Sequence, residues 1–281
     1  KKAAYAPKPQ RNSSARWSSM LYQTTETKTS QEQMQAIFSQ LKIQTCLLGG
    51  WAVYYLVNQN FQKATGRTYI GSRDIDLGFH INMDWNQEQL QNSEFATTIK
   101  VAESIGFNSV SFRLVKDFDI DTGKELTPEE SAKLPLYQIF QLYIDPIVDC
   151  IHPEIKTLLG FVPIDEPLLS LVFQEKMHRT QPLFGKDILI PEPYVMLAMK
   201  INSAPRRDKE HKLLKDIADI YALTWHSDTK LSQLKEQLFA ITPKEKARKT
   251  VQNFSTEDIN KVGAILGIDS QEISRVLKEI A

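Results

Sequence analysis

The sequence predicts a mixed α/β fold that is followed by a mostly helical C-terminal region. Through residue 151, short apolar runs typical of strands alternate with segments whose apolar residues have helical spacing. Beyond residue 151, most segments have the helical pattern. With 281 residues, of which 42% are hydrophobic, the chain is long enough for two domains with their own cores.

The N-terminal region, residues 1–29, is polar and rich in Lys, Arg, Ser, Thr and Pro, which predicts a mobile tail. Ser30 is the expected N-cap of the first helix, because apolar residues recur with helical spacing over residues 31–42. The chain then becomes apolar over residues 43–48, where a short strand is expected. The first regular elements are therefore an amphipathic helix and a strand.

A glycine pair, Gly49-Gly50, interrupts this apolar run. The segment 51–61 is apolar nearly all round and predicts a buried helix. Residues 62–72 are rich in Gly, Thr and Arg and predict a loop, and residues 74–79 have the pattern of a second strand.

The next segments continue the alternation of helices and strands. A helix is expected over residues 94–105, with Gly106 as its C-terminal cap, and a strand over residues 110–115. The polar segment 116–135 predicts a hairpin loop or an insertion. A long apolar run over residues 138–151 predicts a further strand.

The C-terminal half is predicted to contain several helices and one short strand over residues 186–190. The chain therefore divides into a polar tail (1–29), an α/β domain (30–153) and a helical domain (154–281). The helices are expected over residues 166–177, 192–204, 209–226, 230–241, 243–253, 256–266 and 270–280.

The last two predicted helices, within residues 255–281, resemble a helix-turn-helix. A DNA-binding protein normally has several cations on the second helix of this motif. Here Arg275 and Lys278 are opposed by Glu272 and Glu279. A packing hairpin is therefore favoured over a DNA-binding unit.

Composition excludes some classes of partner and location. Lys and Arg total 34, as do Asp and Glu, so no overall positive field attracts nucleic acid. The two cysteines, Cys46 and Cys150, lie in apolar runs, which favours buried thiols and a reducing compartment. No apolar stretch reaches the ~20 residues of a membrane span, and the N-terminus lacks the apolar region of a signal peptide. A cytoplasmic protein is expected.

The segment Ser72-Arg73-Asp74-Ile75-Asp76-Leu77 contains two carboxylates at positions i and i+2. On a strand, these side chains point to the same face of the sheet. Two like charges held so close are unfavourable unless a positive charge lies between them, and hard oxygen ligands suit Mg²⁺. Asp74 and Asp76 are therefore candidate metal ligands.

A third carboxylate is needed to complete a two-metal site and to help deprotonate an acceptor hydroxyl. Asp145 and Asp149 lie in the apolar run 138–151, where a buried carboxylate must be paired or must bind a metal. Pro146 can bend the strand, so the alternation of side chains does not choose between the two.

Two polar features suit a phosphate ligand. The backbone of Gly49-Gly50 is free of side chains and precedes a helix, whose N-terminal amides favour an anion. The hydroxyl of Ser72 is a further phosphate donor. Farther along, Lys200 lies in an apolar helix and either extends to solvent or meets a buried anion. The basic segment 206–215 follows, and it could neutralise a triphosphate or form a solvated helix face.

Gly-Gly, Ser-x-Asp-x-Asp and a later strand carboxylate together resemble the nucleotidyltransferase superfamily related to DNA polymerase β. The long gap from Gly50 to Asp74 is similar to that of the abortive-infection AbiEii-like branch. The segments around Lys200, Arg207 to Lys209 and 215–220 look like the helical signature of that branch. The resemblance covers roughly residues 32–225.

The resemblance implies a nucleotidyltransferase core that moves a nucleoside monophosphate from an NTP to an acceptor hydroxyl and releases pyrophosphate. It implies Mg²⁺ or Mn²⁺ as cofactor. The acceptor would be RNA or tRNA, a protein or a small molecule, and a toxin role would add an antitoxin partner. The residues implied are Asp74, Asp76 and Asp145 (alternatively Asp149) for metal, Lys200 with the metal ligands for catalysis, and Gly49, Gly50, Ser72, Arg73, Lys209 and Asp216 for the nucleotide.

The sequence also permits a function of another class. The same fold could be catalytically inactive and serve to sense a nucleotide or to hold a protein or DNA partner. Nucleotide binding without turnover would favour this alternative.

Overall fold

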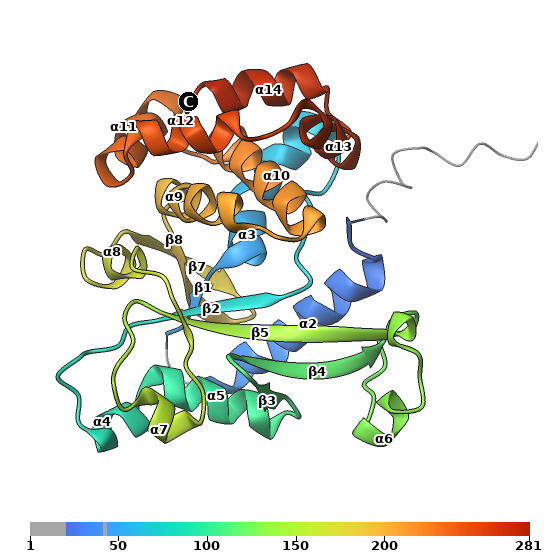
Figure 1. Cartoon of the computed structure of the whole chain (residues 1–281), viewed down its shortest axis with the longest axis vertical. Coiled ribbons are helices and arrows are strands. Elements are labelled where there is room, and N and C mark those ends of the chain that lie inside the picture. Colours follow the sequence, from blue (N-terminus) through green and yellow to red (C-terminus); the bar gives the residue numbers. More distant parts are fainter. Residues whose placement is uncertain (1–20, 42–43) are drawn as a thin grey trace, which may run out of the picture.

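The computed structural model describes residues 21–41 and 44–281, and it has the mixed α/β architecture that the sequence predicts. One mixed eight-stranded sheet crosses the molecule. Helices α4, α5 and α7 lie on one side of it in the view of Figure 1, α3 and α9–α14 lie on the other, and α2 runs obliquely behind it.

The first helix of the described residues, α2 (Thr24–Gln40), begins seven residues before the predicted start at residue 31. The prediction of Ser30 as its N-cap was therefore wrong, as was the prediction that residues 24–29 belong to a tail. The Glu26 carboxylate accepts the backbone N–H of Gln23 at 2.8 Å and so satisfies a donor at the true helix start. Ser30 is buried inside the helix, where its Oγ accepts the indole N–H of Trp51 at 2.9 Å. Residues 1–20 of the predicted tail lie outside the described residues.

The first strand, β1 (Cys46–Leu47), leads directly into α3 (Gly49–Thr65). Helix α3 begins at the glycine pair itself, two residues earlier than predicted. Gly49 has a φ of +60°, which a residue with a side chain rarely adopts, so glycine permits the abrupt turn from strand to helix. Of the other residues of the predicted strand 43–48, residues 44, 45 and 48 have no regular secondary structure. Residue 43 lies outside the described residues.

The centre of the sheet is formed by β2 (Ile75–Phe79) and β5 (Ile139–Val148), which pair in parallel. The strand order is β3-β4-β5-β2-β1-β8-β7, and β6 pairs with the second half of β5. Pro146 lies within β5 opposite Leu77, and the register continues on both sides of it without interruption. The side chains of β5 therefore alternate regularly past the proline.

The region between β2 and β5 contains α4 (Gln87–Gln91), α5 (Glu94–Ser104), β3 (Asn108–Val110) and β4 (Arg113–Asp119). The single strand predicted over residues 110–115 is two strands with a turn at Ser111, whose φ is +59°. Of the segment 116–135, residues 116–119 belong to β4, and the rest lies in the hairpin connection between the antiparallel strands β4 and β5. This connection holds the short helices α6 (Pro128–Ser131) and η1 (Leu136–Gln138).

The segment after β5 departs most from the prediction. It contains α7 (Ile155–Leu159), β6 (Ile164–Asp165), α8 (Leu169–Phe173), β7 (His178–Leu183) and β8 (Lys186–Pro191). The helix predicted over residues 166–177 is reduced to α8, and β7 was not predicted. Because β6, β7 and β8 join the same sheet, the predicted division at residues 153/154 runs through the sheet.

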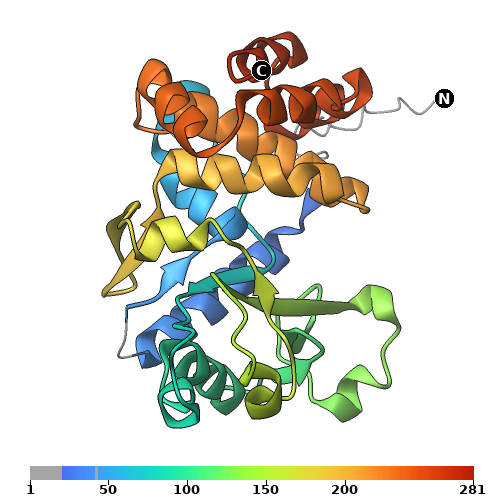
Figure 2. The same cartoon turned by 60° about the vertical axis from the view of Figure 1, so that its left-hand side comes forward.

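The remaining helices lie within two residues of their predicted limits, and Figure 2 shows them stacked above the sheet. They are α9 (Pro193–Ser203), the short η2 (Ala204–Arg206), α10 (Glu210–His226), α11 (Leu231–Ile241), α12 (Lys244–Gln252), α13 (Thr256–Leu266) and α14 (Ser270–Lys278). Within residues 21–41 and 44–281, no helix combines the length and the hydrophobicity needed to cross a membrane.

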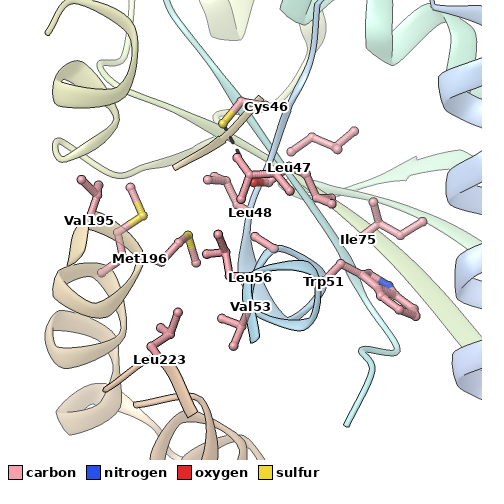
Figure 3. Close-up of a cluster of buried hydrophobic side chains, with 14 of the residues drawn as sticks. Cys46, Leu47, Leu48, Trp51, Val53, Leu56, Ile75, Val195, Met196 and Leu223 are labelled. Carbon is pink, nitrogen blue, oxygen red and sulfur yellow. Dashed lines mark hydrogen bonds between the residues drawn. The ribbon is translucent and has the colours of Figure 1, made fainter. Parts of the chain in front are cut away.

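One hydrophobic core joins the α/β half to the helical half, in place of the two separate cores expected. Figure 3 shows the part where they meet: Leu48, the N-cap residue of α3, and Leu56 of α3 face Val195 and Met196 of α9 and Leu223 of α10. This packing fixes α9 and α10 above the sheet and so defines the cleft described below.

Candidate active site

A cleft of about 440 Å³ lies between the sheet and helices α9 and α10. The predicted residues Asp74, Asp76 and Asp145 line it, and so do Gly49, Gly50, Ser72, Lys200 and Asp216. Arg73, Lys209 and Asp149 do not line it. The structure therefore brings together most of the residues that the sequence analysis selected from distant parts of the chain.

The three carboxylates meet because of strand pairing. Asp76 of β2 is the register partner of Asp145 of β5, so the two residues are neighbours across the sheet. Asp74 lies in the bend just before β2, two residues from Asp76, and lines the same cleft. Asp145 lines the cleft, whereas Asp149, which would share its face in a regular strand, lies beyond the end of β5 and does not line it.

Asp149 has a different environment. It follows the end of β5, where one carboxylate oxygen accepts the backbone N–H of Ile81 at 2.8 Å. The other oxygen lies 2.5 Å from Nδ1 of His80. These contacts connect the ends of β2 and β5, and Asp149 does not line the cleft.

The pKa values of all three cleft carboxylates are raised. Burial is the largest cause for each. The charge of Asp74 adds to the rise in the pKa of Asp76, and the charge of Asp76 adds to the rise in the pKa of Asp145. Lys212 and Arg113 act in the opposite direction without cancelling the effect. The folded chain thus holds three mutually repelling acids in a place where a cation would stabilise them.

The donor set suits a divalent cation, although the side chains are not arranged as a finished metal site. Among the described residues, no group of three or more His, Cys, Asp or Glu side chains is placed to hold a metal ion as it stands. One oxygen of Asp145 accepts a hydrogen bond from Arg113 at 2.8 Å. Oδ1 of Asp74 and Oδ1 of Asp145 are buried and lack a hydrogen-bond partner in the described part of the chain. Hard oxygen atoms without partners fit Mg²⁺ or Mn²⁺.

The glycine turn lies against these carboxylates. A Cβ atom on Gly49 would overlap the carboxylate of Asp76, and one on Gly50 would lie 2.9 Å from Oγ of Ser72. Only a bare backbone allows the N-terminus of α3 to come this close. Among residues 21–41 and 44–281, no side chain caps this helix end by a hydrogen bond, so its amide groups can meet an anion in the cleft. Ser72 donates its hydroxyl to the carbonyl of Asp74 at 3.0 Å and holds the bend before β2.

Helix α10 supplies two of the cations that line the cleft. Lys212 and Lys215 line it, and Nζ of Lys212 lies 3.9 Å from Oδ2 of Asp74. Lys215 is buried beside Gly50, where burial lowers its pKa despite the ion pair with Asp219 at 2.5 Å. The sequence analysis selected Lys209, which is exposed at the N-cap of α10. Lys212 follows Lys209 by three residues, or about one turn of the predicted helix 209–226. This helical spacing is the sequence signal that could have identified Lys212 as a residue of the cleft.

Lys200 is a buried, fully paired cation. Its Nζ lies 2.8 Å from Oδ1 of Asp216 and 2.8 Å from Oδ2 of Asp219. Burial alone would lower the pKa of Lys200, but the two carboxylates outweigh it and raise the pKa. Burial likewise opposes ionisation of Asp216, yet Lys200 and Arg207 lower its pKa to about 2. Both groups therefore stay charged, and together they position Arg207 at the edge of the cleft.

Arg73 supports the site from outside the cleft. Its guanidinium lies 3.3 Å from Glu26 of α2 and 4.0 Å from Oδ1 of Asp74. It therefore links α2 to the bend before β2. Two lining residues that the sequence analysis missed are Tyr22, which falls in the supposed tail, and Arg113, whose role depends on the unpredicted β3–β4 turn.

No protein-family model and no curated protein matches the sequence. Among solved structures, the chain is similar to a crystal structure of an antigenic nucleotidyltransferase-like protein from Paracoccidioides brasiliensis. The two chains are 15% identical, the TM-score is 0.45, and the alignment covers 87% of this chain and 94% of the other. Similarity at this level identifies neither a family nor an activity, so the function is inferred from the cleft itself.

Proposed function

We propose that this protein is a metal-dependent nucleotidyltransferase. The cleft would bind an NTP with Mg²⁺ or Mn²⁺ and transfer the nucleoside monophosphate to an acceptor hydroxyl. The observation that carries this proposal is the meeting of Asp74, Asp76 and Asp145 in front of an uncapped helix N-terminus at Gly49. Carboxylates that face an anion-binding turn require a cation between them, and this combination suits the phosphates of a nucleotide.

Each part of the cleft has a distinct task in this proposal. Asp74, Asp76 and Asp145 would hold the metal, which when bound offsets the charge of the phosphates. The amides of Gly49 and Gly50 and the ammonium of Lys215 would bind phosphate oxygens. Fixed donors aimed at a phosphoryl group supply much of the catalysis in this type of reaction.

The acceptor hydroxyl needs a base, and Asp145 fits that role. Without a bound cation, burial and the charge of Asp76 raise its pKa to about 7. A metal held by the three carboxylates would lower this pKa and keep Asp145 ionised, so that it could accept the proton. Lys200 is a poor proton donor because its pKa is raised, so we assign it to positioning Asp216 and Asp219.

The setting of the reaction is a further part of the proposal. A toxin of the AbiEii-like branch with an antitoxin partner is supported only by the motifs of residues 32–225. The same holds for RNA, tRNA, protein or small molecules as acceptors, and for a cytoplasmic location.

A second candidate function is favoured by one contact. Arg113 occupies an oxygen of Asp145, and this pairing would suit a catalytically inactive module that binds a nucleotide without turnover. Nucleotide binding together with a lack of transfer would distinguish this candidate from the enzyme.

The proposal is tested by incubating the purified protein with each radiolabelled NTP, Mg²⁺ or Mn²⁺, and total RNA or total protein. We expect label transfer by the wild type and a loss of at least about a hundredfold in Asp76→Asn. Asp84→Asn is the matched control, because Asp84 is exposed and does not line the cleft. Absence of transfer with every NTP, or equal transfer by Asp76→Asn, would contradict the proposal.

A further inference from the structure

The last two helices form a hairpin with features of a helix-turn-helix. Helix α13 ends at Leu266 and α14 begins at Ser270, so three residues connect them, which is a usual length for this motif. Gly267 makes the turn with a φ of +66°. A Cβ atom on Gly263 would lie 2.8 Å from the carbonyl oxygen of Ile268, so glycine allows the turn to pack closely on α13.

The hairpin packs on the rest of the protein through one face. Both helices contact α10, and their buried apolar side chains recur with helical spacing. These buried residues are Val262, Ile265, Leu266, Ile273, Val276 and Leu277. Figure 1 shows α13 and α14 at the end of the helical layer that lies away from the sheet. The hairpin therefore presents a second face that the described part of the chain leaves uncovered.

The two acids of this segment are engaged by other helices. Oε1 of Glu272 accepts the hydroxyl of Tyr221 on α10 at 3.3 Å. Glu279 forms an ion pair with Lys235 of α11 at 3.0 Å. The sequence analysis set these acids against the cations of α14, but the structure gives them partners elsewhere. They are therefore not the ion-pair partners of those cations.

The cations of α14 line a groove instead. This groove of about 370 Å³ lies between α13 and α14, and its charged residues are Arg275 and Lys278. Within the described part of the chain, neither cation forms an ion pair, and no carboxylate lines the groove. Gln271 and Ser274 lie on the same face of α14 as the two cations, because the four residues follow one another at helical spacing. The uncovered face of α14 is thus a row of cationic and hydrogen-bonding side chains.

Arg275 is held in place by an aromatic ring. The carbon of its guanidinium lies 4.6 Å from the centre of the ring of Trp225, which is 39% exposed on α10. Stacking of this kind orients the planar guanidinium and leaves its N–H groups available to a ligand. None of these N–H groups donates a hydrogen bond within the described residues. Arg275 is therefore a preoriented donor on the uncovered face.

We propose that α13 and α14 form a DNA-binding helix-turn-helix that places the uncovered face of α14 in the major groove of a duplex. The side chains of this face are of the types that read base edges, since Arg pairs with guanine, Gln with adenine and Ser with either. Arg275, Gln271 and Ser274 would make these contacts, and Lys278 would bind a backbone phosphate. The site is independent of the proposed function, because the groove shares no lining residue with the cleft.

Groove geometry favours DNA over RNA as the partner. The major groove of B-DNA admits an α-helix, whereas that of an RNA duplex is deep and narrow. The formal net charge of the chain is +0, and two cations in the groove neutralise about two phosphates, so nonspecific attraction to a polyanion is weak. Contacts to base edges would therefore supply most of the affinity.

The test begins with a selection, in which the full chain enriches duplexes from a DNA library with about 20 randomised base pairs. Fluorescence anisotropy then measures the dissociation constants of the enriched duplex, a scrambled duplex of the same composition, and an RNA duplex of the enriched sequence. We expect the enriched DNA to bind at least about tenfold more tightly than the other two. The logarithm of its association constant should fall with the logarithm of the salt concentration with a slope of about −2.

Variants of α14 test the contacts. Arg275→Gln and Gln271→Ala should each weaken binding of the enriched duplex about fivefold or more, because each removes a contact to a base. Gln271 is exposed, so its replacement tests the face of α14 without disturbing the packing of Arg275 on Trp225. Arg248→Gln is the matched control and should bind as the wild type does, because Arg248 is exposed on α12 and does not line the groove.

Several results would overturn the proposal. They are the lack of any enriched duplex, equal binding of the enriched and scrambled duplexes, and full affinity in both Arg275→Gln and Gln271→Ala. An RNA duplex that binds as tightly as the DNA would also overturn it, because α14 would then not lie in a major groove. None of these results bears on nucleotide transfer in the cleft, so the two proposals fail separately.

Discussion

The buried carboxylate of Asp76 lowers the stability of the metal-free protein, and its proposed function is to bind a metal. It is buried beside Asp74 and Asp145, and its pKa is raised because burial and the charge of Asp74 disfavour ionisation. Natural active sites often keep such unfavourable charges because the ligand stabilises them. Removing the charge should therefore stabilise the protein when no metal is bound.

The variant Asp76→Asn should be more stable than the wild type at pH 8 in the presence of a chelator, by an amount on the order of 1 kcal/mol. Because the pKa in the folded state lies above that in the unfolded state, the folded state binds more protons between these two values. The free energy of unfolding of the wild type therefore falls as pH rises through this window. Asn does not titrate, so the advantage of the variant should vanish near pH 4. Urea unfolding of the variant and the wild type at pH 8 and pH 4 measures this difference in stability. A variant that is less stable than the wild type at pH 8 would contradict the prediction.

Replacing Gly49 by alanine should lower the free energy of unfolding more than replacing Gly66, the C-cap residue of the same helix. Gly49→Ala forces a left-handed φ on alanine and also drives its Cβ into the carboxylate of Asp76. Gly66→Ala has a similar φ of +71°, but nothing lies within 4 Å of the added Cβ. We expect Gly66→Ala to cost about 1 kcal/mol, and Gly49→Ala to cost at least about 1 kcal/mol more. Equal losses in denaturant unfolding would show that the close approach to Asp76 is absent.

At the scale of elements, α2 is held to α3 by one buried hydrogen bond. Ser30→Ala would leave the indole N–H of Trp51 without its partner and should cost about 1–3 kcal/mol. Ser39→Ala on the same helix is the control, because Ser39 is exposed and bonds only to a carbonyl of its own helix. It should change stability by less than about 0.5 kcal/mol. Thermal unfolding of the two variants compares them, and similar losses would mean that Ser30 and Trp51 do not form this hydrogen bond.

The elements that could be predicted from the sequence are those with a strong local signal. Helices α9 to α14 have clear apolar periodicity, and several end at recognisable caps such as Gly267. Strands β6 and β7 were missed because β6 has only two residues and β7 depends on its pairing with β8. The start of α2 was missed because residues 24–29 are polar, and the contacts that hold them come from distant parts of the chain.

In the candidate site, too, some residues could be predicted from a local pattern and others depend on contacts between distant parts of the chain. The paired carboxylates and the glycine turn carry their chemistry in a few adjacent residues, so the sequence suffices to select them. The choice of Asp145 over Asp149 depends on the register with β2, which no local pattern gives. Lys212 replaces Lys209 because the orientation of α10 over the sheet decides which turn faces Asp74.

At the scale of the whole molecule, one hydrophobic core connects the two predicted halves. Trp51 belongs to α3, which packs between the sheet and the helical layer, and Trp225 belongs to α10. Tryptophan fluorescence and far-ultraviolet circular dichroism of the same protein should therefore report the same unfolding midpoint in urea. Two separate midpoints would show that the halves unfold independently and that the cleft is not held by a common core.

The central claim is that Asp74, Asp76 and Asp145 form one divalent-cation site facing Gly49. The most direct test is the binding of Mn²⁺, measured by electron paramagnetic resonance, to the wild type, Asp76→Asn and the control Asp84→Asn. We expect the wild type and Asp84→Asn to bind Mn²⁺ with the same affinity, and Asp76→Asn to lose at least about tenfold in affinity. Equal affinity of all three proteins, or no binding by the wild type, would contradict the claim.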